Sequence, residues 1–381
     1  MPKEIASHKN NNLDFLRLLF AVVVVFSHSY PLTQGEKYQR ERLWLATGGL
    51  FSFGTVAVAF FFIASGFLIT ASLLKSPTRV EYVRRRCLRI LPGYGAALII
   101  SICAVAPFAT AAGSRVWRQF LAQAVSFDPL SARDVFPSNP LPGVLNGSLW
   151  TVRYEIGCYF VLLLLGAAGF LRRPGCAVAL LFCSFLIGPL IRWQPVLAAN
   201  VPLIGDIKWW GLFLPYFLAG AVAYLWKDSI PLRLWMFIAA CIACAAAVGT
   251  KNPGLVYPTA AVCGAYFVLY LGFNARLPFH NFGRFGDFSY GTYLYAFPIQ
   301  QLIVMARPGI SPLILFVLAA PLAVLAGVAS WYGVERHFIR RKPTSRVTDG
   351  PVFTDAAFNH DTFAPTATSS LRVARAAVDL Y

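Results

Sequence analysis

Charged residues are scarce in this 381-residue chain, and acidic residues are the scarcest: 13% of the residues are charged and only 16 are Asp or Glu. A soluble domain carries about 25% charged residues, so this deficit excludes an ordinary soluble protein. Because 57% of the residues are hydrophobic, we expect most of the chain to lie in lipid. The formal charge of +17 does not indicate a nucleic-acid-binding protein, since the basic residues cluster between apolar segments.

Metal-ligand spacing, a cleavable signal peptide and internal repeats are also missing from the sequence. The eight cysteines lie almost all in apolar segments, and Cys241-x-x-Cys244 is typical of small-residue packing between helices. Met1–Asn12 is polar and no small-residue cleavage site follows the first apolar run, so we expect that run to stay in the membrane. The lack of a repeat weakens the hypothesis of an inverted-repeat transporter without excluding it.

Long apolar segments predict an all-α polytopic integral membrane protein with about ten transmembrane helices. The predicted spans are residues 14–33, 50–74, 90–112, 149–171, 175–193, 209–227, 231–249, 254–273, 288–306 and 311–333. The loop 75–89 is the most basic, and the other basic connections fall on the same side of the membrane. The positive-inside rule therefore predicts that both termini are cytoplasmic. We expect a single domain over residues 1–340 and a disordered cytoplasmic tail over 341–381.

The first apolar run contains two ionisable residues, Arg17 and His28. Eleven residues of helix place them roughly 16 Å apart and within roughly 20° of the same face, so both can line one path. An ionisable side chain within a membrane span is costly and by default marks a functional site. The alternatives are that Arg17 snorkels to the interface and that His28 hydrogen-bonds to a neighbouring helix.

A second cluster of candidate residues is the basic run that precedes the third predicted span. Arg86 and Arg89 lie three residues apart, so they face one side of a helix. Guanidinium groups with this spacing suit the bidentate binding of phosphate. Retention of a cytoplasmic loop by positive charge explains the run equally well.

Glu155 is a candidate partner for His28. It lies near the start of the fourth predicted span, after the loop 113–148, whose Pro, Ser, Asn and Gly content disfavours a continuous helix. We expect Glu155 about one and a half turns below the outer surface, where its carboxylate could orient the His28 imidazole. An Arg153–Glu155 pair is the alternative, although residues two apart on a helix do not face each other.

These features, taken together, resemble the acyltransferase-3 family of membrane proteins. The matching motifs are L-D-x-L-R at Leu13–Arg17 with His28 eleven residues after the arginine, F-x-x-S-G-F-L at Phe62–Leu68, R-x-x-R followed by I-x-P-x-Y at Arg86–Tyr94, W-(S/T)-x-x-x-E at Trp150–Glu155, G-x-x-S-Y-x-x-Y-L-x-x-x-P at Gly286–Pro298, and Val334–Arg336. Many members of the family carry a histidine where this chain has Ala296, so we expect no essential second histidine. His28 is the only histidine in any predicted span.

The resemblance implies a membrane-bound O-acyltransferase of a bacterial cytoplasmic (inner) membrane. It implies transfer of an acyl group, acetyl by default, from cytosolic acyl-CoA to a saccharide hydroxyl, the acceptor being a lipopolysaccharide, an exopolysaccharide or a secreted oligosaccharide. Acyl-CoA is a co-substrate in this scheme, and we expect no bound cofactor and no metal. A transporter or exporter of a saccharide or lipid-linked sugar is the main alternative, and a structural scaffold is the third.

The resemblance also assigns roles to residues. The expected catalytic residues are His28, Glu155 and Arg17. The residues expected to hold the acyl-CoA phosphates are Arg86, Arg89, Arg85, Arg17 and Tyr94. The residues expected to shape the site are Asp14, Ser65, Gly66, Trp150, Arg153, Tyr290 and Tyr293. Close packing of Ser65 and Gly66 between helices and an interfacial aromatic belt for the two tyrosines are the structural alternatives.

Overall fold

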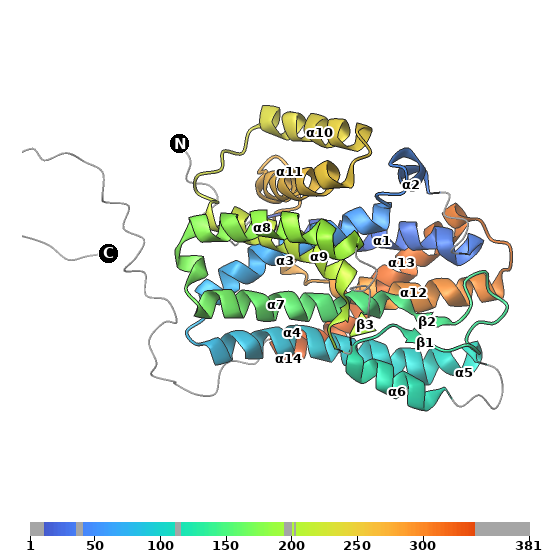
Figure 1. The fold of residues 1–381 in the computed structure, drawn as a ribbon. Helices are drawn as coiled ribbons and strands as arrows, with labels where there is room; N and C mark the ends of the chain where they lie inside the picture. Colours follow the sequence, from blue (N-terminus) through green and yellow to red (C-terminus); the bar gives the residue numbers. More distant parts are fainter. Residues whose placement is uncertain (1–10, 36–40, 111–115, 194–199, 202, 340–381) are drawn as a thin grey trace, which may run out of the picture.

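A computed structural model describes residues 11–35, 41–110, 116–193, 200–201 and 203–339 (Figure 1). The predicted tail 341–381 lies outside these residues. The described chain is mostly helical. The long helices are α1 (Leu13–Gln34), α3 (Phe53–Leu74), α4 (Arg79–Ile99), α7 (Val152–Ala167), α8 (Pro174–Trp193), α9 (Ile207–Leu225), α10 (Leu234–Gly249), α11 (Pro253–Phe273), α12 (Ser289–Ala306) and α13 (Pro312–Ser330).

Short elements connect and extend these helices. The short elements are α2 (Arg42–Ala46), α5 (Ala106–Ala109), α6 (Trp117–Ser126), α14 (Arg336–Ile339), β1 (Leu130–Ser131), β2 (Val144–Asn146), β3 (Asn200–Val201) and β4 (Gly205–Asp206). The strands pair as β1 with β2 and β3 with β4, both antiparallel. They are minor exceptions to the predicted all-α class.

Each of the ten predicted spans overlaps one long helix. Six helical stretches within the described residues are long and apolar enough to cross a membrane: Leu13–Gln34, Phe53–Leu74, Arg79–Ala109, Gly147–Ala167, Pro253–Phe273 and Pro312–Ile339. The helical class and the set of long apolar helices agree with a multi-pass membrane protein. The number of ten spans and the cytoplasmic position of the termini remain predictions.

The basic segment 75–89 was expected to be a loop, and this expectation is wrong. Helix α4 already begins at Arg79, after a cap in which the Thr78 hydroxyl accepts a hydrogen bond from the Glu81 amide at 3.1 Å. Glu81 then pairs with Arg84 and Arg85 at 3.1 and 2.8 Å. Capping and ion pairs three and four residues apart both favour helix, so they carry the helix through the basic run.

The segment expected to be an irregular outer loop, residues 113–148, is folded into the protein where it is described. Phe136 and Leu145 have no exposed surface. Asn146 donates a hydrogen bond to the Leu294 carbonyl at 3.0 Å, and Asn139 donates one to the Gln301 carbonyl at 3.0 Å. Because both carbonyls belong to α12, the segment brings the start of α7 against the first half of that helix.

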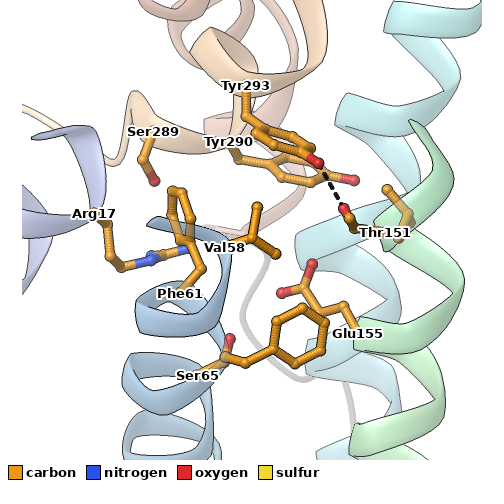
Figure 2. Close-up of a pocket in the computed structure, with 11 residues that line it drawn as sticks. Arg17, Val58, Phe61, Ser65, Thr151, Glu155, Ser289, Tyr290 and Tyr293 are labelled. Carbon is orange, nitrogen blue, oxygen red and sulfur yellow. Dashed lines mark hydrogen bonds between the residues drawn. The ribbon is translucent and has the colours of Figure 1, made fainter. Parts of the chain in front are cut away.

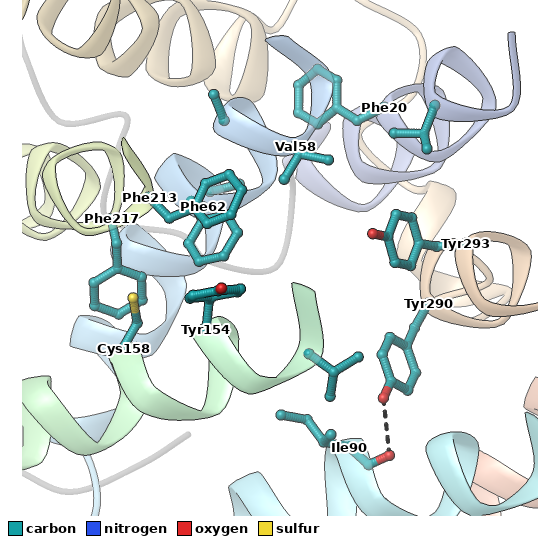
Figure 3. Packing of buried hydrophobic residues seen from close by; sticks show 14 of the residues in the cluster. Phe20, Val58, Phe62, Ile90, Tyr154, Cys158, Phe213, Phe217, Tyr290 and Tyr293 are labelled. Atoms are coloured by element: carbon teal, nitrogen blue, oxygen red, sulfur yellow. Dashed lines mark hydrogen bonds between the residues drawn. The ribbon is translucent and has the colours of Figure 1, made fainter. Parts of the chain in front are cut away.

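Close contact between α3 and α9 organises the core. A Cβ atom at Gly66 would lie 1.9 Å from the Phe217 carbonyl oxygen, and one at Gly220 would lie 2.0 Å from that of Ile63. Glycine at both positions therefore allows the two backbones to touch. Next to this crossing the rings of Phe62 and Phe213 stack at 4.5 Å (Figure 3). Helices α10 and α11 lie on one side of this core and α4 and α6 on the other (Figure 1).

Candidate active site

A first cavity of about 520 Å³ is lined by residues of α1, α3, α7 and α12 (Figure 2). Arg17 enters it from α1, Ser65 from α3, Glu155 from α7, and Tyr290 and Tyr293 from α12. All five residues were predicted for the site, and the structure brings them together from four helices that are distant in sequence. The cavity thus combines a guanidinium group, a carboxylate and several hydroxyl groups, all within a mainly apolar wall.

The cavity has an ordered hydrogen-bonding rim. The Thr151 and Tyr293 hydroxyls lie 2.8 Å apart, and the Tyr159 hydroxyl donates a hydrogen bond to Glu155. The Tyr290 hydroxyl donates to the Ile90 carbonyl at 3.2 Å (Figure 3). These contacts fix the tyrosines as parts of the protein interior and not as members of an interfacial aromatic belt.

An ion-pair network lies beside this cavity. Asp287, just before α12, pairs with both Arg17 and Arg89 and accepts a hydrogen bond from the Ser289 hydroxyl at 2.5 Å. Arg89 also pairs with Glu335 at 3.0 Å. Burial disfavours the charged form of Asp287, but Arg17 and Arg89 outweigh it and lower the pKa of this carboxyl to about 2. Asp287 is therefore ionised across the physiological range, and the network is charge-paired.

A second cavity, of about 660 Å³, contains His28. Glu41, Trp150 and Trp209 line it as well, and Val58 and Tyr293 belong to the walls of both cavities. The His28 ring meets that of Phe297 edge to face at 5.5 Å. Its Nδ1 atom is buried and has no hydrogen-bond partner among the described residues. His28 is thus held by packing, and none of the described residues satisfies its Nδ1 atom.

The expected contact between Glu155 and His28 is absent from the described residues. The structure places Glu155 in the Arg17 cavity, and no hydrogen bond or ion pair joins it to His28 within the described residues. The reason is the inward fold of the segment before α7: it starts that helix beside Tyr293, in the second turn of α12. Glu155, one helical turn later, therefore faces the Arg17 cavity.

The basic residues of α4 point in three directions. Arg85 is exposed and pairs with Glu81. Arg89 belongs to the ion-pair network. Arg86 lines a third cavity, of about 650 Å³, whose walls include Tyr82 and Tyr159. Its Nη2 donates to the Ser72 hydroxyl at 3.3 Å, and its buried Nε has no partner within the described residues. Only Arg86 of the three keeps hydrogen-bonding capacity that no described carboxylate occupies.

Several predicted site residues have structural contacts instead. The Tyr94 hydroxyl donates to the Ala124 carbonyl at 3.0 Å, and Arg153 pairs with Asp128, not with Glu155. Gly66 serves the contact of α3 with α9. Asp14 lies against Gly283, where a Cβ atom would be 2.2 Å from its carboxylate oxygen.

The family model described as an acyltransferase domain matches residues 10–332, which is most of this chain. The chain belongs to the acyltransferase-3 family. An O-acetyl transferase of Shigella phage Sf6 is 28% identical over 353 residues, covering 88% of this chain and 97% of that protein. Nodulation protein 10 of Rhizobium leguminosarum bv. viciae is 24% identical over 353 residues, covering 79% of this chain and 86% of that protein. No solved structure gives a significant match.

In this acyltransferase, four polar residues of the site were given no role by the sequence analysis. Asp287 and Glu335 lie inside motifs that carry the family resemblance, yet their pairing with distant arginines follows only from the fold. Tyr159 follows Glu155 by one helical turn, a spacing at which side chains meet. Glu41 lies in a stretch that was expected to be an outer connection, where no sequence pattern singled it out.

Proposed function

We propose that this acyltransferase transfers an acyl group, acetyl by default, from cytosolic acyl-CoA to a hydroxyl of a saccharide at the outer face of a bacterial cytoplasmic membrane. The acceptor would be a lipopolysaccharide, an exopolysaccharide or a secreted oligosaccharide. The observation that carries this proposal is His28, a half-buried imidazole in a cavity, held by packing, whose Nδ1 has no hydrogen-bond partner among the described residues. The name of the phage Sf6 relative, an O-acetyl transferase, supports acetyl and an oxygen acceptor.

His28 would act as the general base. It takes the proton of the acceptor hydroxyl while the hydroxyl oxygen attacks the thioester carbonyl. The carbon–sulfur bond breaks, and the proton passes from the imidazolium to the thiolate, giving the acyl ester and CoA. The Tyr293 hydroxyl lies on the wall that the Arg17 cavity and the His28 cavity share, where a hydroxyl donor suits the oxyanion that develops on the carbonyl oxygen. Transient acylation of His28 is the covalent version of the same scheme.

The donor would reach His28 along the three cavities. Tyr159 lines the Arg86 cavity and hydrogen-bonds Glu155 in the first cavity, and Tyr293 joins the first cavity to that of His28. We assign the acyl-CoA phosphates to Arg86. Arg89 and Arg17 hold Asp287, so their part is to position the helices around the donor, because binding a phosphate would cost them these ion pairs.

Mass spectrometry of the surface polysaccharides and secreted oligosaccharides, comparing wild type with a His28→Ala strain, tests the proposal. Loss of one acyl mass from one sugar in the variant, at normal protein level, is the expected result. Unchanged sugar masses together with retention of the product inside the cell would refute acyl transfer and indicate an exporter.

A further inference from the structure

The His28 cavity contains an acidic residue that the proposed chemistry does not use. Glu41 lies at the start of α2 and is 3% exposed. One carboxylate oxygen accepts a hydrogen bond from the Ser27 hydroxyl at 2.6 Å, and the other accepts one from the Phe53 amide. Ser27 precedes His28 in α1, so the carboxylate is tied to the turn that carries the imidazole.

No cation pairs with Glu41 within the described residues. The ion pairs found there leave it out, and both of its hydrogen-bond donors are neutral. Within the part of the chain that the structure describes, Glu41 is a buried carboxylate without a counter-charge; such a group is costly, and the cost points to a use. Each carboxylate oxygen has two acceptor sites, so both oxygens retain capacity for donors from a molecule in the cavity.

Two indoles complete the cavity. The rings of Trp150 and Trp209 meet at 4.8 Å and 59°, and Trp209 also stacks on Phe213 at 5.8 Å. Indole rings and a carboxylate in the wall of one cavity fit a sugar ring, which offers C–H groups on its faces and hydroxyl donors at its edge.

We propose that this cavity is the acceptor subsite, in which Glu41 accepts hydrogen bonds from a hydroxyl of the sugar while Trp150 and Trp209 pack on its ring. This inference rests on the proposed acyl transfer and names the residue that binds the acceptor. Glu41 orients the sugar so that another of its hydroxyls meets His28. The carboxylate binds the acceptor and takes no part in proton transfer.

The test uses the full chain in membrane vesicles with radiolabelled acetyl-CoA and surface glycans extracted from a strain that lacks the gene. The variants are Glu41→Gln, Trp209→Leu and, as the control, Asp228→Asn, which changes an exposed carboxylate paired with Lys227. Loss of one hydrogen bond to a charged group predicts a rise of about 10- to 100-fold in the acceptor concentration for half-saturation in Glu41→Gln. We expect the acetyl-CoA concentration for half-saturation to change by less than about two-fold in the same variant.

Trp209→Leu should show the same selective effect if Glu41→Gln accumulates poorly. Wild-type acceptor saturation in both variants would overturn the subsite while leaving acyl transfer standing. A parallel loss of affinity for acceptor and acetyl-CoA would overturn it as well, because that pattern indicates a structural role. Absence of labelling by the wild-type protein would instead refute the proposed function itself.

Discussion

The ion-pair network around Asp287 and the cavity around His28 are built in opposite ways. In the network every charged group has a partner: Asp287 holds Arg17 and Arg89, and Arg89 also holds Glu335. In the cavity His28 has an unpartnered Nδ1 among the described residues, and Glu41 has neutral donors only. Both regions bury polar atoms in a largely apolar protein.

The difference separates structural roles from chemical ones. A buried charge that is fully paired fixes the elements that carry it, and breaking one partner is expensive. A buried polar atom without a partner is also expensive, and the protein retains it where a substrate supplies the missing hydrogen bond. We therefore expect substitutions in the network to affect mainly stability and substitutions in the cavities to affect mainly kinetics.

His28→Ala should cause the largest kinetic effect. Removing a general base lowers the rate of transfer about 100- to 10,000-fold, whereas the stability of the purified protein should change little because the ring has no hydrogen bond within the described residues to lose. Initial rates of acetyl transfer and thermal unfolding in detergent measure the two properties. His337→Ala, which changes an exposed histidine, is the matched control. Transfer within ten-fold of wild type would remove His28 from the chemistry.

Asp287→Asn should cause the largest loss of stability. It leaves Arg17 and Arg89 without their shared carboxylate, which for a buried pair costs about 3–5 kcal/mol. Unfolding free energies in detergent measure the loss. A loss of unfolding free energy below about 1 kcal/mol would show that the network contributes little to stability. The proposed difference between the network and the His28 cavity would then be wrong.

The same variant makes a prediction about pH. The folded-state pKa of Asp287 is lowered to about 2, below the ordinary value of about 3.9. A carboxyl with a depressed pKa contributes stability that is fully present above its unfolded-state pKa and is lost as the pH falls through the folded-state value. The difference in stability between wild type and Asp287→Asn should therefore be constant from pH 8 to 5 and shrink between about pH 4 and 2.

Arg86→Gln and Arg89→Gln should separate binding from stability within one helix. Arg86 has no described carboxylate partner, so its loss should raise the KM for acetyl-CoA about 10- to 100-fold with little change in unfolding. Arg89 holds Asp287 and Glu335, so its loss should lower the unfolding temperature. Saturation curves with acetyl-CoA measure the KM of both variants, and melting curves measure their unfolding temperatures. Equal destabilisation by the two substitutions would contradict the division of roles.

The sequence predicted the long helices and five of the eleven residues that line the first cavity, because apolar length and a few polar motifs determine them. Arg17, Ser65, Glu155, Tyr290 and Tyr293 were all predicted, and they meet in one cavity. Contacts between particular side chains were harder to predict from the sequence. The link between His28 and Glu155 was wrong because the start of α7 is set by side-chain contacts of the preceding segment with α12.

Roles that depend on long-range partners could not be read from the sequence. Nothing local shows that Asp287 accepts from arginines on α1 and α4, or that Glu41 reaches the cavity of His28. Tyr94 shows the converse, because a motif position expected to bind the donor instead supports α6 through the Ala124 carbonyl. Motif membership selected the right segments, and the fold decided what each side chain does.

Arg85→Ala should have the smallest effect, although the residue lies next to Arg86. Its side chain is exposed and pairs with Glu81 four residues earlier, and such surface pairs contribute about 0.3–0.5 kcal/mol. The KM for acetyl-CoA should stay within about two-fold of wild type, since neither Arg85 nor Glu81 lines the Arg86 cavity and so weak a pair adds little to binding. A rise comparable to that of Arg86→Gln would place Arg85 in the phosphate site. This variant thus tests whether the exposure and ion pairing of an arginine, and not its proximity to Arg86 in the sequence, determine its role in binding.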